Sequence, residues 1–99
     1  MIKHIESVEQ FNEEIKSGLV LVDFFADWCG PYKMLAPELE RLDEEVEIKI
    51  LKINVDELAA LARQFRVMSI PTLMLYHNGE LVKRESSYMP LETLKEFVK

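Results

Sequence analysis

The chain has a single cysteine, Cys29, in the run Ala-Asp-Trp-Cys-Gly-Pro-Tyr-Lys over residues 26–33. A thiolate attacks a disulfide to form a mixed disulfide, and in dithiol exchangers a second thiol with Cys-x-x-Cys spacing then releases the product. Position 32 would carry that second thiol, but it holds Tyr32. The sequence therefore allows the first step of exchange and leaves the second to a thiol from outside the chain.

A helix is expected from about residue 30 to residue 44. Pro31 suits its first turn, and three leucines recur at helical spacing at positions 35, 39 and 42. Cys29 then lies at the helix N-terminus, where unpaired backbone N–H groups and the positive end of the helix dipole favour the thiolate. We predict a partly exposed, nucleophilic thiol; the alternative is a small buried hydrophobic residue.

Tyr32 lies three residues after Cys29 and leaves the expected helix from nearly the same face. Its ring could fill the space of the missing thiol, or it could block the approach of a partner disulfide. Its hydroxyl could instead donate a hydrogen bond to the thiolate. A further alternative is that Tyr32 was introduced into an ordinary dithiol protein.

Two charges fall within expected buried strands. Asp23 is the only charge in residues 19–26, a nearly apolar run typical of a strand covered on both faces. In the strand expected at residues 48–53, Lys52 shares a face with isoleucines at positions 48 and 50. A buried, isolated carboxylate is costly, so Asp23 should pair or take up a proton. For Lys52, an exposed sheet edge is the alternative.

The remaining patterns predict an α/β fold with one domain over residues 1–99. Ser7 and Gln10 form a capping-box pattern before a first helix, Asp56 is expected to cap a short helix, and Asn78-Gly79 predicts a hairpin turn. The strands of the hairpin are residues 72–76 and 81–84, a short strand is possible at 2–5, and a last helix starts near residue 90. Helix and strand signals alternate, which favours a mixed sheet with helices on both faces.

Composition excludes several classes of function. Eighteen acidic and twelve basic residues give a formal charge of −6, which disfavours nucleic-acid binding. No apolar run reaches the roughly 18 residues of a membrane span, and the first residues lack the apolar core of a signal peptide. His4 and His77 have no metal-ligand spacing. We expect a cytoplasmic monomer with no metal and no cofactor.

Two motifs resemble the thioredoxin family: Phe-Phe-Ala-Asp-Trp-Cys-Gly-Pro at residues 24–31, and Met-Ser-Ile-Pro-Thr at residues 68–72. The resemblance covers essentially the whole chain, because Asp23, Lys-Ile-Asn-Val-Asp at 52–56 and Asn-Gly-Glu at 78–80 also fall where a thioredoxin has them. It implies a thioredoxin fold, a central mixed β-sheet flanked by four helices. It also implies that Cys29 is the nucleophile and that the Ile70–Pro71 bond is cis.

The resemblance implies catalytic roles for Asp23 and Lys52, which would lie near one another beneath the thiol site. The acid would assist proton transfer to the resolving cysteine, so here it loses its main recipient. We therefore predict that Asp23 is a retained remnant that lowers stability.

The resemblance also implies a substrate-binding surface beside the thiol. Its members would be Trp28, Gly30, Pro31, Tyr32, Ile70 and Pro71. For Trp28, Ile70 and Pro71 the alternative is a place in the core. Residues 86–88, Ser-Ser-Tyr, depart from the family pattern, which usually has a glycine-containing turn there. We expect this departure to alter the partner groove.

The sequence leaves three main interpretations of function, besides a protein that accumulates stable mixed disulfides or dimers through Cys29. The first is a thioredoxin-type thiol–disulfide exchanger acting on protein disulfides or thiols, with Cys29 as nucleophile and a small external thiol as resolver. The second is a redox-inactive module that binds protein partners through the same surface. The third is a mutated form of an ordinary dithiol protein.

Overall fold

The computed structural model describes residues 1–28 and 30–99. The elements follow the order β1 (Ile2–His4), α1 (Val8–Glu14), β2 (Leu19–Phe25), α2 (Gly30–Glu45), β3 (Lys49–Asn54), α3 (Ala59–Gln64), β4 (Thr72–His77), β5 (Glu80–Glu85) and α4 (Leu91–Phe97). The sheet has the strand order β1-β3-β2-β4-β5. Strands β1, β3 and β2 are parallel, whereas β4 runs antiparallel to both β2 and β5. The predicted mixed sheet is confirmed.

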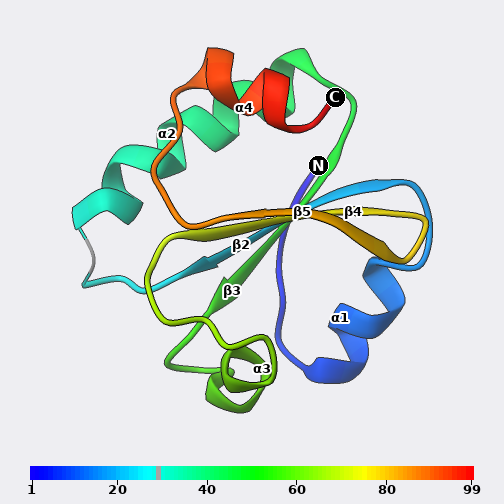
Figure 1. Cartoon of the computed structure of the whole chain (residues 1–99), viewed down its shortest axis with the longest axis vertical. Helices are drawn as coiled ribbons and strands as arrows, with labels where there is room; N and C mark the ends of the chain where they lie inside the picture. The colour runs from blue at the N-terminus through cyan, green and yellow to red at the C-terminus, as the bar shows by residue number, and fades with distance from the viewer. Residues whose placement is uncertain (29) are drawn as a thin grey trace.

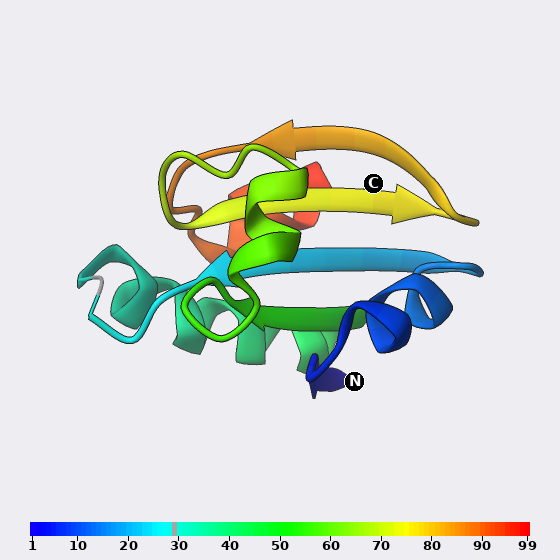
Figure 2. The same ribbon diagram turned by 90° about the horizontal axis from the view of Figure 1, so that it is seen from below.

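Helices cover both faces of this sheet. Figure 1 shows α2 and α4 on one face and α1 and α3 on the other, and Figure 2 shows α1 and α3 in front of the strands. Side chains that alternate along the strands therefore enter two separate apolar clusters, one on each face. None of the helices in the described ranges has the length and apolar character that crossing a bilayer requires.

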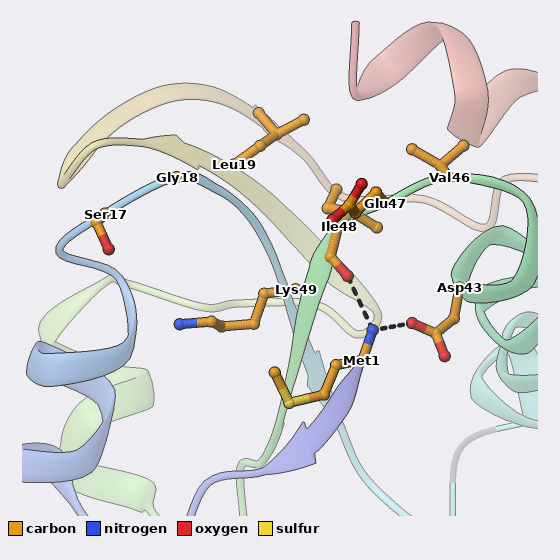
Figure 3. A pocket seen from close by; sticks show the side chains of 9 residues that line it. All are labelled: Met1, Ser17, Gly18, Leu19, Asp43, Val46, Glu47, Ile48 and Lys49. Atoms are coloured by element: carbon orange, nitrogen blue, oxygen red, sulfur yellow. Dashed lines mark hydrogen bonds and ion pairs between the residues drawn. The ribbon is translucent and has the colours of Figure 1, made fainter.

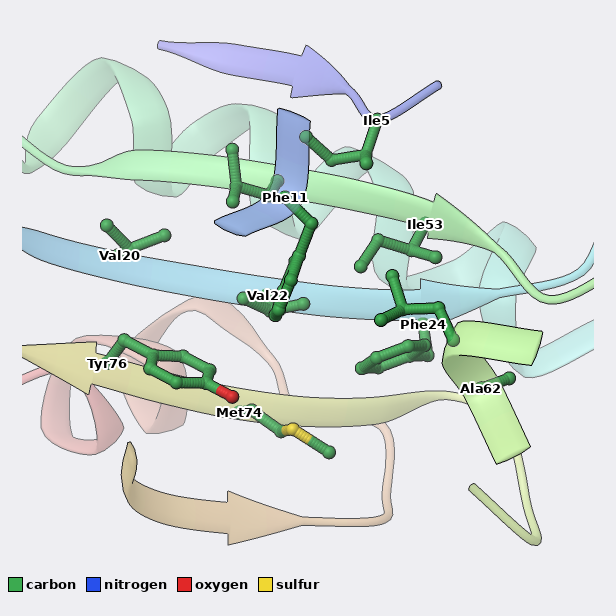
Figure 4. Close-up of a cluster of buried hydrophobic side chains, with 11 residues drawn as sticks. Ile5, Phe11, Val20, Val22, Phe24, Ile53, Ala62, Met74 and Tyr76 are labelled. Carbon is green, nitrogen blue, oxygen red and sulfur yellow. The ribbon is translucent and has the colours of Figure 1, made fainter. Parts of the chain in front are cut away.

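The α1/α3 cluster consists of Ile5, Phe11, Val20, Val22, Phe24, Leu51, Ile53, Leu61, Ala62, Met74 and Tyr76 (Figure 4). The α2/α4 cluster consists of Leu21, Leu35, Leu39, Leu42, Ile48, Ile50, Leu73, Leu75, Met89, Leu94 and Val98. Both clusters contain side chains from β2, β3 and β4. These three strands are therefore buried on both faces, which explains their nearly continuous apolar sequences.

The first helix begins at the predicted cap. The Ser7 hydroxyl accepts a 3.0 Å hydrogen bond from the Gln10 backbone N–H, which satisfies one of the free N–H groups of the first turn. The Gln10 side chain, however, accepts its 2.7 Å hydrogen bond from the backbone N–H of Glu6 rather than from that of Ser7. In a standard capping box the Gln10 side chain would accept from the N–H of the N-cap residue, Ser7. Here it accepts from the residue before the cap.

The hairpin turn has the geometry that its sequence predicts. Asn78 has φ 50° and Gly79 has φ 88°, and positive φ at both central residues is typical of a two-residue type I′ turn. The turn is also held from outside, because the Asn78 side chain accepts a 2.8 Å hydrogen bond from Gly18 N–H. The Asn78 N–H in turn donates to the Gly18 carbonyl at 3.0 Å.

One expected helix cap is wrong. Helix α3 starts at Ala59, its N-cap is Leu58, and no side chain caps it. Asp56 lies in the preceding turn, where its N–H donates a 2.8 Å hydrogen bond to the side-chain oxygen of Asn54. Asn54 bonding of this kind stabilises a turn directly after a strand, and it leaves the Asp56 carboxylate free for another partner.

Candidate functional site

The predicted site residues gather at one end of the sheet. Trp28 follows the carboxyl end of β2, Gly30 and Pro31 open α2, and Ile70-Pro71 directly precedes β4. The peptide bond between Ile70 and Pro71 is cis. Cys29, the predicted nucleophile, lies outside the described residues.

Trp28 is a large apolar group at this end and is 70% exposed. Its indole N–H donates a 3.0 Å hydrogen bond to the Asp56 carboxylate, which fixes the direction of an otherwise exposed ring. The Asp56 carboxylate is a site group that the sequence does not reveal, because an aspartate after a strand also fits a helix cap.

A shallow groove of about 160 Å³ begins at this ring. It is lined by Trp28, Val55, Val67, Met68, Ser69 and Ile70. Met68 is 91% exposed, so a large flexible apolar side chain borders the groove. Pro71 is buried, which corrects its expected place on the surface: Trp28 and Met68 form the exposed apolar edge, and Ile70 is half-buried between surface and core.

Asp23 and Lys52 lie beneath this surface as register partners on the neighbouring parallel strands β2 and β3. Both are buried: Asp23 has no exposed surface and Lys52 is 7% exposed. The exposed-edge alternative for Lys52 is therefore wrong. Within the part of the chain that the structure describes, neither carboxylate oxygen of Asp23 has a hydrogen-bond partner.

Burial raises the pKa of Asp23 to about 7, because the ionised carboxylate loses its hydration, and the positive charge of Lys52 opposes this shift. The attraction is thus the weaker of the two effects. Among the described residues, Asp23 therefore has no close ionic partner, and near neutral pH its carboxyl is protonated in a large fraction of the molecules. This is the second of the two outcomes that the sequence leaves open for Asp23.

Lys52 instead contacts Tyr32. The Lys52 ammonium donates a 2.9 Å hydrogen bond to the Tyr32 hydroxyl and lies 4.6 Å from the centroid of the same ring. The Tyr32 ring stacks on Phe25, with centroids 4.4 Å apart and planes 19° from parallel. The ammonium is 5.2 Å from the Phe25 centroid, so it lies against both rings.

Phe25 belongs to the site although its sequence context points only to a strand. It is the last residue of β2, and alternation along the strand puts it on the same face as Asp23. His4, the register partner of Lys52 on β1, meets the Phe25 ring edge-on at 6.1 Å. Tyr32, Phe25 and His4 thus form an aromatic row beside a buried ammonium.

Residues 86–88 divide between surface and core. Ser86 and Ser87 are exposed, and the hydroxyl oxygens of Ser86 and Thr72 are 3.3 Å apart in a hydrogen bond. Tyr88 is half-buried and packs against the α2/α4 cluster. Tyr88, the bulkiest residue of the segment, therefore packs largely into the core. The exposed part of the segment consists of Ser86 and Ser87.

A larger hollow, of about 400 Å³, lies at the opposite end of the sheet, where β2 and β3 begin (Figure 3). The N-terminal ammonium of Met1 donates hydrogen bonds there to the Asp43 carboxylate and, at 3.0 Å, to the Ile48 carbonyl. None of the predicted site residues lines this hollow. Among the described residues, no group of three or more acidic, histidine or cysteine side chains could hold a metal ion.

Comparisons with known proteins agree with this geometry. The family model described as Thioredoxin matches residues 2–99. A thioredoxin of Bacillus subtilis (strain 168) is 48% identical over 92 residues, covering 91% of this chain and 88% of the relative. A thioredoxin of Chlamydia caviae is 53% identical over 85 residues, covering 85% and 82% of the two chains.

Solved structures show the same architecture. A mutant thioredoxin from Halobacterium salinarum NRC-1 superposes with a TM-score of 0.91 at 35% identity, over 98% of this chain and 87% of that one. The predicted α/β arrangement, a five-stranded mixed sheet flanked by four helices, is therefore the thioredoxin fold.

Proposed function

This chain belongs to the thioredoxin family, and on that basis we propose that it carries out thiol–disulfide exchange on protein partners with Cys29 as its only nucleophile. The observation that carries the proposal has two parts: the sequence keeps Trp-Cys-Gly-Pro at residues 28–31 with Tyr32 in the position of a second thiol, and Trp28 lines an exposed apolar groove. The attacking group is retained, and the internal resolving group is not.

The exchange balances with two molecules of a small external thiol. The Cys29 thiolate attacks one sulfur of a partner disulfide, that S–S bond breaks, and the other partner sulfur leaves as a thiolate that takes up a proton. An external thiolate then attacks the Cys29 sulfur and releases the partner as a dithiol. A second external thiolate attacks the small-molecule sulfur now joined to Cys29 and restores the free thiolate. The net products are the reduced partner and a small-molecule disulfide.

Substrates would meet the face that carries Trp28, Gly30, Pro31 and Ile70. The exposed indole ring and the groove beside it offer an apolar surface to the chain around a disulfide. Asp23 and Lys52 keep a supporting role under this proposal: the buried carboxyl is partly protonated near neutral pH and so can exchange a proton in the range where thiols react. Because Tyr32 replaces the resolving cysteine, the group that would mainly receive the Asp23 proton is absent.

External resolution is slower than internal resolution, because a second thiol in the same site has a much higher effective concentration. It also requires surroundings in which small thiols are kept reduced, so a cytoplasmic location belongs to the same proposal. We include a monomeric state, since exchange with protein partners needs the Trp28 face uncovered.

A protein-binding module is the second candidate, and the exposed Trp28 and Met68 are the observation that favours it. Such a module would hold partners on this apolar face without breaking a bond. The two candidates differ in what Cys29 contributes, because only exchange requires its sulfur.

Insulin reduction by dithiothreitol separates them. We expect the chain to reduce insulin faster than dithiothreitol alone, Cys29→Ser to abolish the excess rate, and Tyr32→Cys to raise it by restoring an internal thiol. Tyr32→Ser is the matched control, since it removes the same ring without adding a resolving thiol. No excess rate for the native chain, together with partners retained by Cys29→Ser, would establish the binding module and exclude exchange. If Tyr32→Cys alone is active, the chain is a mutated form of a dithiol protein.

A further inference from the structure

We propose that Tyr32 is a positioning residue for Lys52, holding the lysine ammonium on its phenol oxygen and ring and away from the carboxyl of Asp23. The bearing of this role on exchange rests on the proposed function. The placement of Lys52 itself does not, because it concerns buried groups whose ionisation can be measured whether or not the protein turns over a disulfide.

The hydrogen bond gives Lys52 a defined direction. An ammonium has three donors and no acceptor, and a phenol oxygen is a good acceptor. At 2.9 Å the Lys52 Nζ to Tyr32 hydroxyl distance is that of a normal hydrogen bond. Both residues come from regular elements: Lys52 lies on β3, an interior strand of the sheet, and Tyr32 lies in the first turn of α2.

The rings add a second, independent hold on the same charge. The ammonium lies 4.6 Å from the Tyr32 centroid and 5.2 Å from the Phe25 centroid, within the range in which a ring face attracts a cation. The two rings stack on each other, so Tyr32 cannot turn away without separating from Phe25. His4 also contacts Phe25, in an edge-on arrangement of the two rings.

Asp23 shows the consequence. It is the register partner of Lys52, and adjacent strands are only about 4.8 Å apart, so an ion pair lies within reach of the long lysine side chain. Yet both carboxylate oxygens lack a hydrogen-bond partner among the described residues. Its partner on the other side, Leu73 of β4, is apolar. Lys52 is the charged group that acts on the Asp23 carboxyl. Lys52 in turn contacts Tyr32 from α2 and is the register partner of His4 on β1.

A residue at position 32 without an acceptor or a ring would leave Lys52 with a single strong partner, the Asp23 carboxylate. Tyr32 therefore takes part in setting how readily Asp23 gives up its proton. Tyr32 thus does more than fill the space of an absent thiol. It determines whether the Lys52 ammonium binds the Tyr32 hydroxyl or the Asp23 carboxylate.

The test is the titration of Asp23, followed by the ¹³C resonance of its carboxyl carbon in the full-length protein. Tyr32→Phe keeps the ring stack and removes the acceptor, so Lys52 should move toward Asp23 and lower the titration midpoint by about one pH unit. Tyr76→Phe is the matched control. It removes a buried phenol hydroxyl from the opposite face of the sheet, and the Asp23 midpoint should stay where it is.

A double-variant experiment decides whether the effect passes through Lys52. In a Lys52→Gln background, Tyr32→Phe should leave the Asp23 midpoint unchanged. An equal downward shift in that background would mean that the phenol acts on Asp23 by another route, and the proposal would be wrong. Tyr32→Leu removes the ring as well as the acceptor, and an unchanged or raised midpoint in both Tyr32→Phe and Tyr32→Leu would overturn the proposal directly. Insulin reduction by the same variants tests the proposed function only. A loss of that activity would leave the Asp23 titration, and the conclusion drawn from it, unchanged.

Discussion

The Lys52 ammonium donates a 2.9 Å hydrogen bond to the Tyr32 hydroxyl, and Tyr32 occupies the position that a second exchange thiol would hold. Tyr32 at this position therefore contacts a buried charged group, the ammonium of Lys52 on β3. A change of thiol chemistry and a change in the surroundings of Asp23 are coupled through one side chain.

Asp23 should make the stability of this protein depend on pH. Its pKa in the folded chain is raised to about 7 from an ordinary value of 3.8. The folded state thus binds more protons than the unfolded state between about pH 4 and pH 7, and the free energy of unfolding falls as pH rises through this window. Integrated over about three pH units, the loss is on the order of 4 kcal/mol.

Asp23→Asn measures this effect by urea unfolding at pH 5, 7 and 9. Asparagine does not titrate, so the stability of the variant relative to the native chain should increase from pH 5 to pH 7 and then level off. Asp27→Asn is the control, because Asp27 is an exposed carboxylate whose replacement should change the free energy of unfolding little. A constant difference between Asp23→Asn and the native chain across the three pH values would contradict the raised pKa.

Glu14 offers a pH dependence of the opposite sign. Its carboxylate accepts a 2.7 Å hydrogen bond from Lys3 and another 2.7 Å bond from Lys49, and these partners lower its pKa. The contacts therefore stabilise the fold above the unfolded pKa and lose their effect as pH falls through the lower, folded value. Because the cluster is partly exposed, we expect Glu14→Gln to cost no more than about 1 kcal/mol at pH 7.

Salt and acid should both reduce that cost. High salt screens charges near the surface, and as pH falls a growing fraction of the native Glu14 takes up a proton and loses its charge. Thermal melts at pH 7 and pH 3, in low and high salt, check this. Glu13→Gln is the matched control on the same helix, since the Glu13 carboxylate forms an exposed i,i+3 ion pair with Lys16. An equal effect of both substitutions at pH 7 would show that the Lys3 and Lys49 contacts add nothing.

The main elements of the fold could be predicted because local signals agree with burial. The apolar run of β2, the Asn78-Gly79 turn and the Ser7 cap each have one physical explanation, and the structure places all three as expected. Asp56 misleads because an aspartate after a strand suits both a helix cap and a side-chain partner. Here the Trp28 indole lies within reach, and Asn54 already stabilises the turn.

The contacts of Tyr32 could not be predicted from spacing. Helical periodicity places its ring near the face of Cys29, but the partner of its hydroxyl depends on which strand residue lies beneath the first turn of α2. That residue is Lys52, twenty positions further along the chain, and its approach depends on the parallel pairing of β2 and β3. Long-range pairing of this kind leaves no local pattern in the sequence.

Trp28 gives an optical measure of the site, because it is the only tryptophan in the chain. Asp56→Ala removes the acceptor of its 3.0 Å indole hydrogen bond. The exposed ring should then move more freely, so the fluorescence anisotropy should decay faster with little change in overall stability. Asp27→Ala, at another exposed acid of the same end, should leave the decay as it is. A decay unaffected by Asp56→Ala would mean that packing against the groove, and not this hydrogen bond, holds the ring.

The three glycines allow backbone strain to be separated from steric contact. Gly79 and Gly18 both have positive φ, 88° and 78°, whereas Gly30 opens a helix and an added Cβ there meets nothing within 4 Å. A Cβ at Gly18 meets nothing within 4 Å, and one at Gly79 meets the Lys16 backbone only at the ordinary distance of 3.6 Å. Alanine at either positive-φ position should therefore cost about 1–2 kcal/mol through backbone strain alone. Gly30→Ala should cost nothing or stabilise slightly, since alanine is the better helix former. Urea unfolding of the three variants checks the ranking, and a loss for Gly30→Ala as large as for Gly79→Ala would show that positive φ is not the cause.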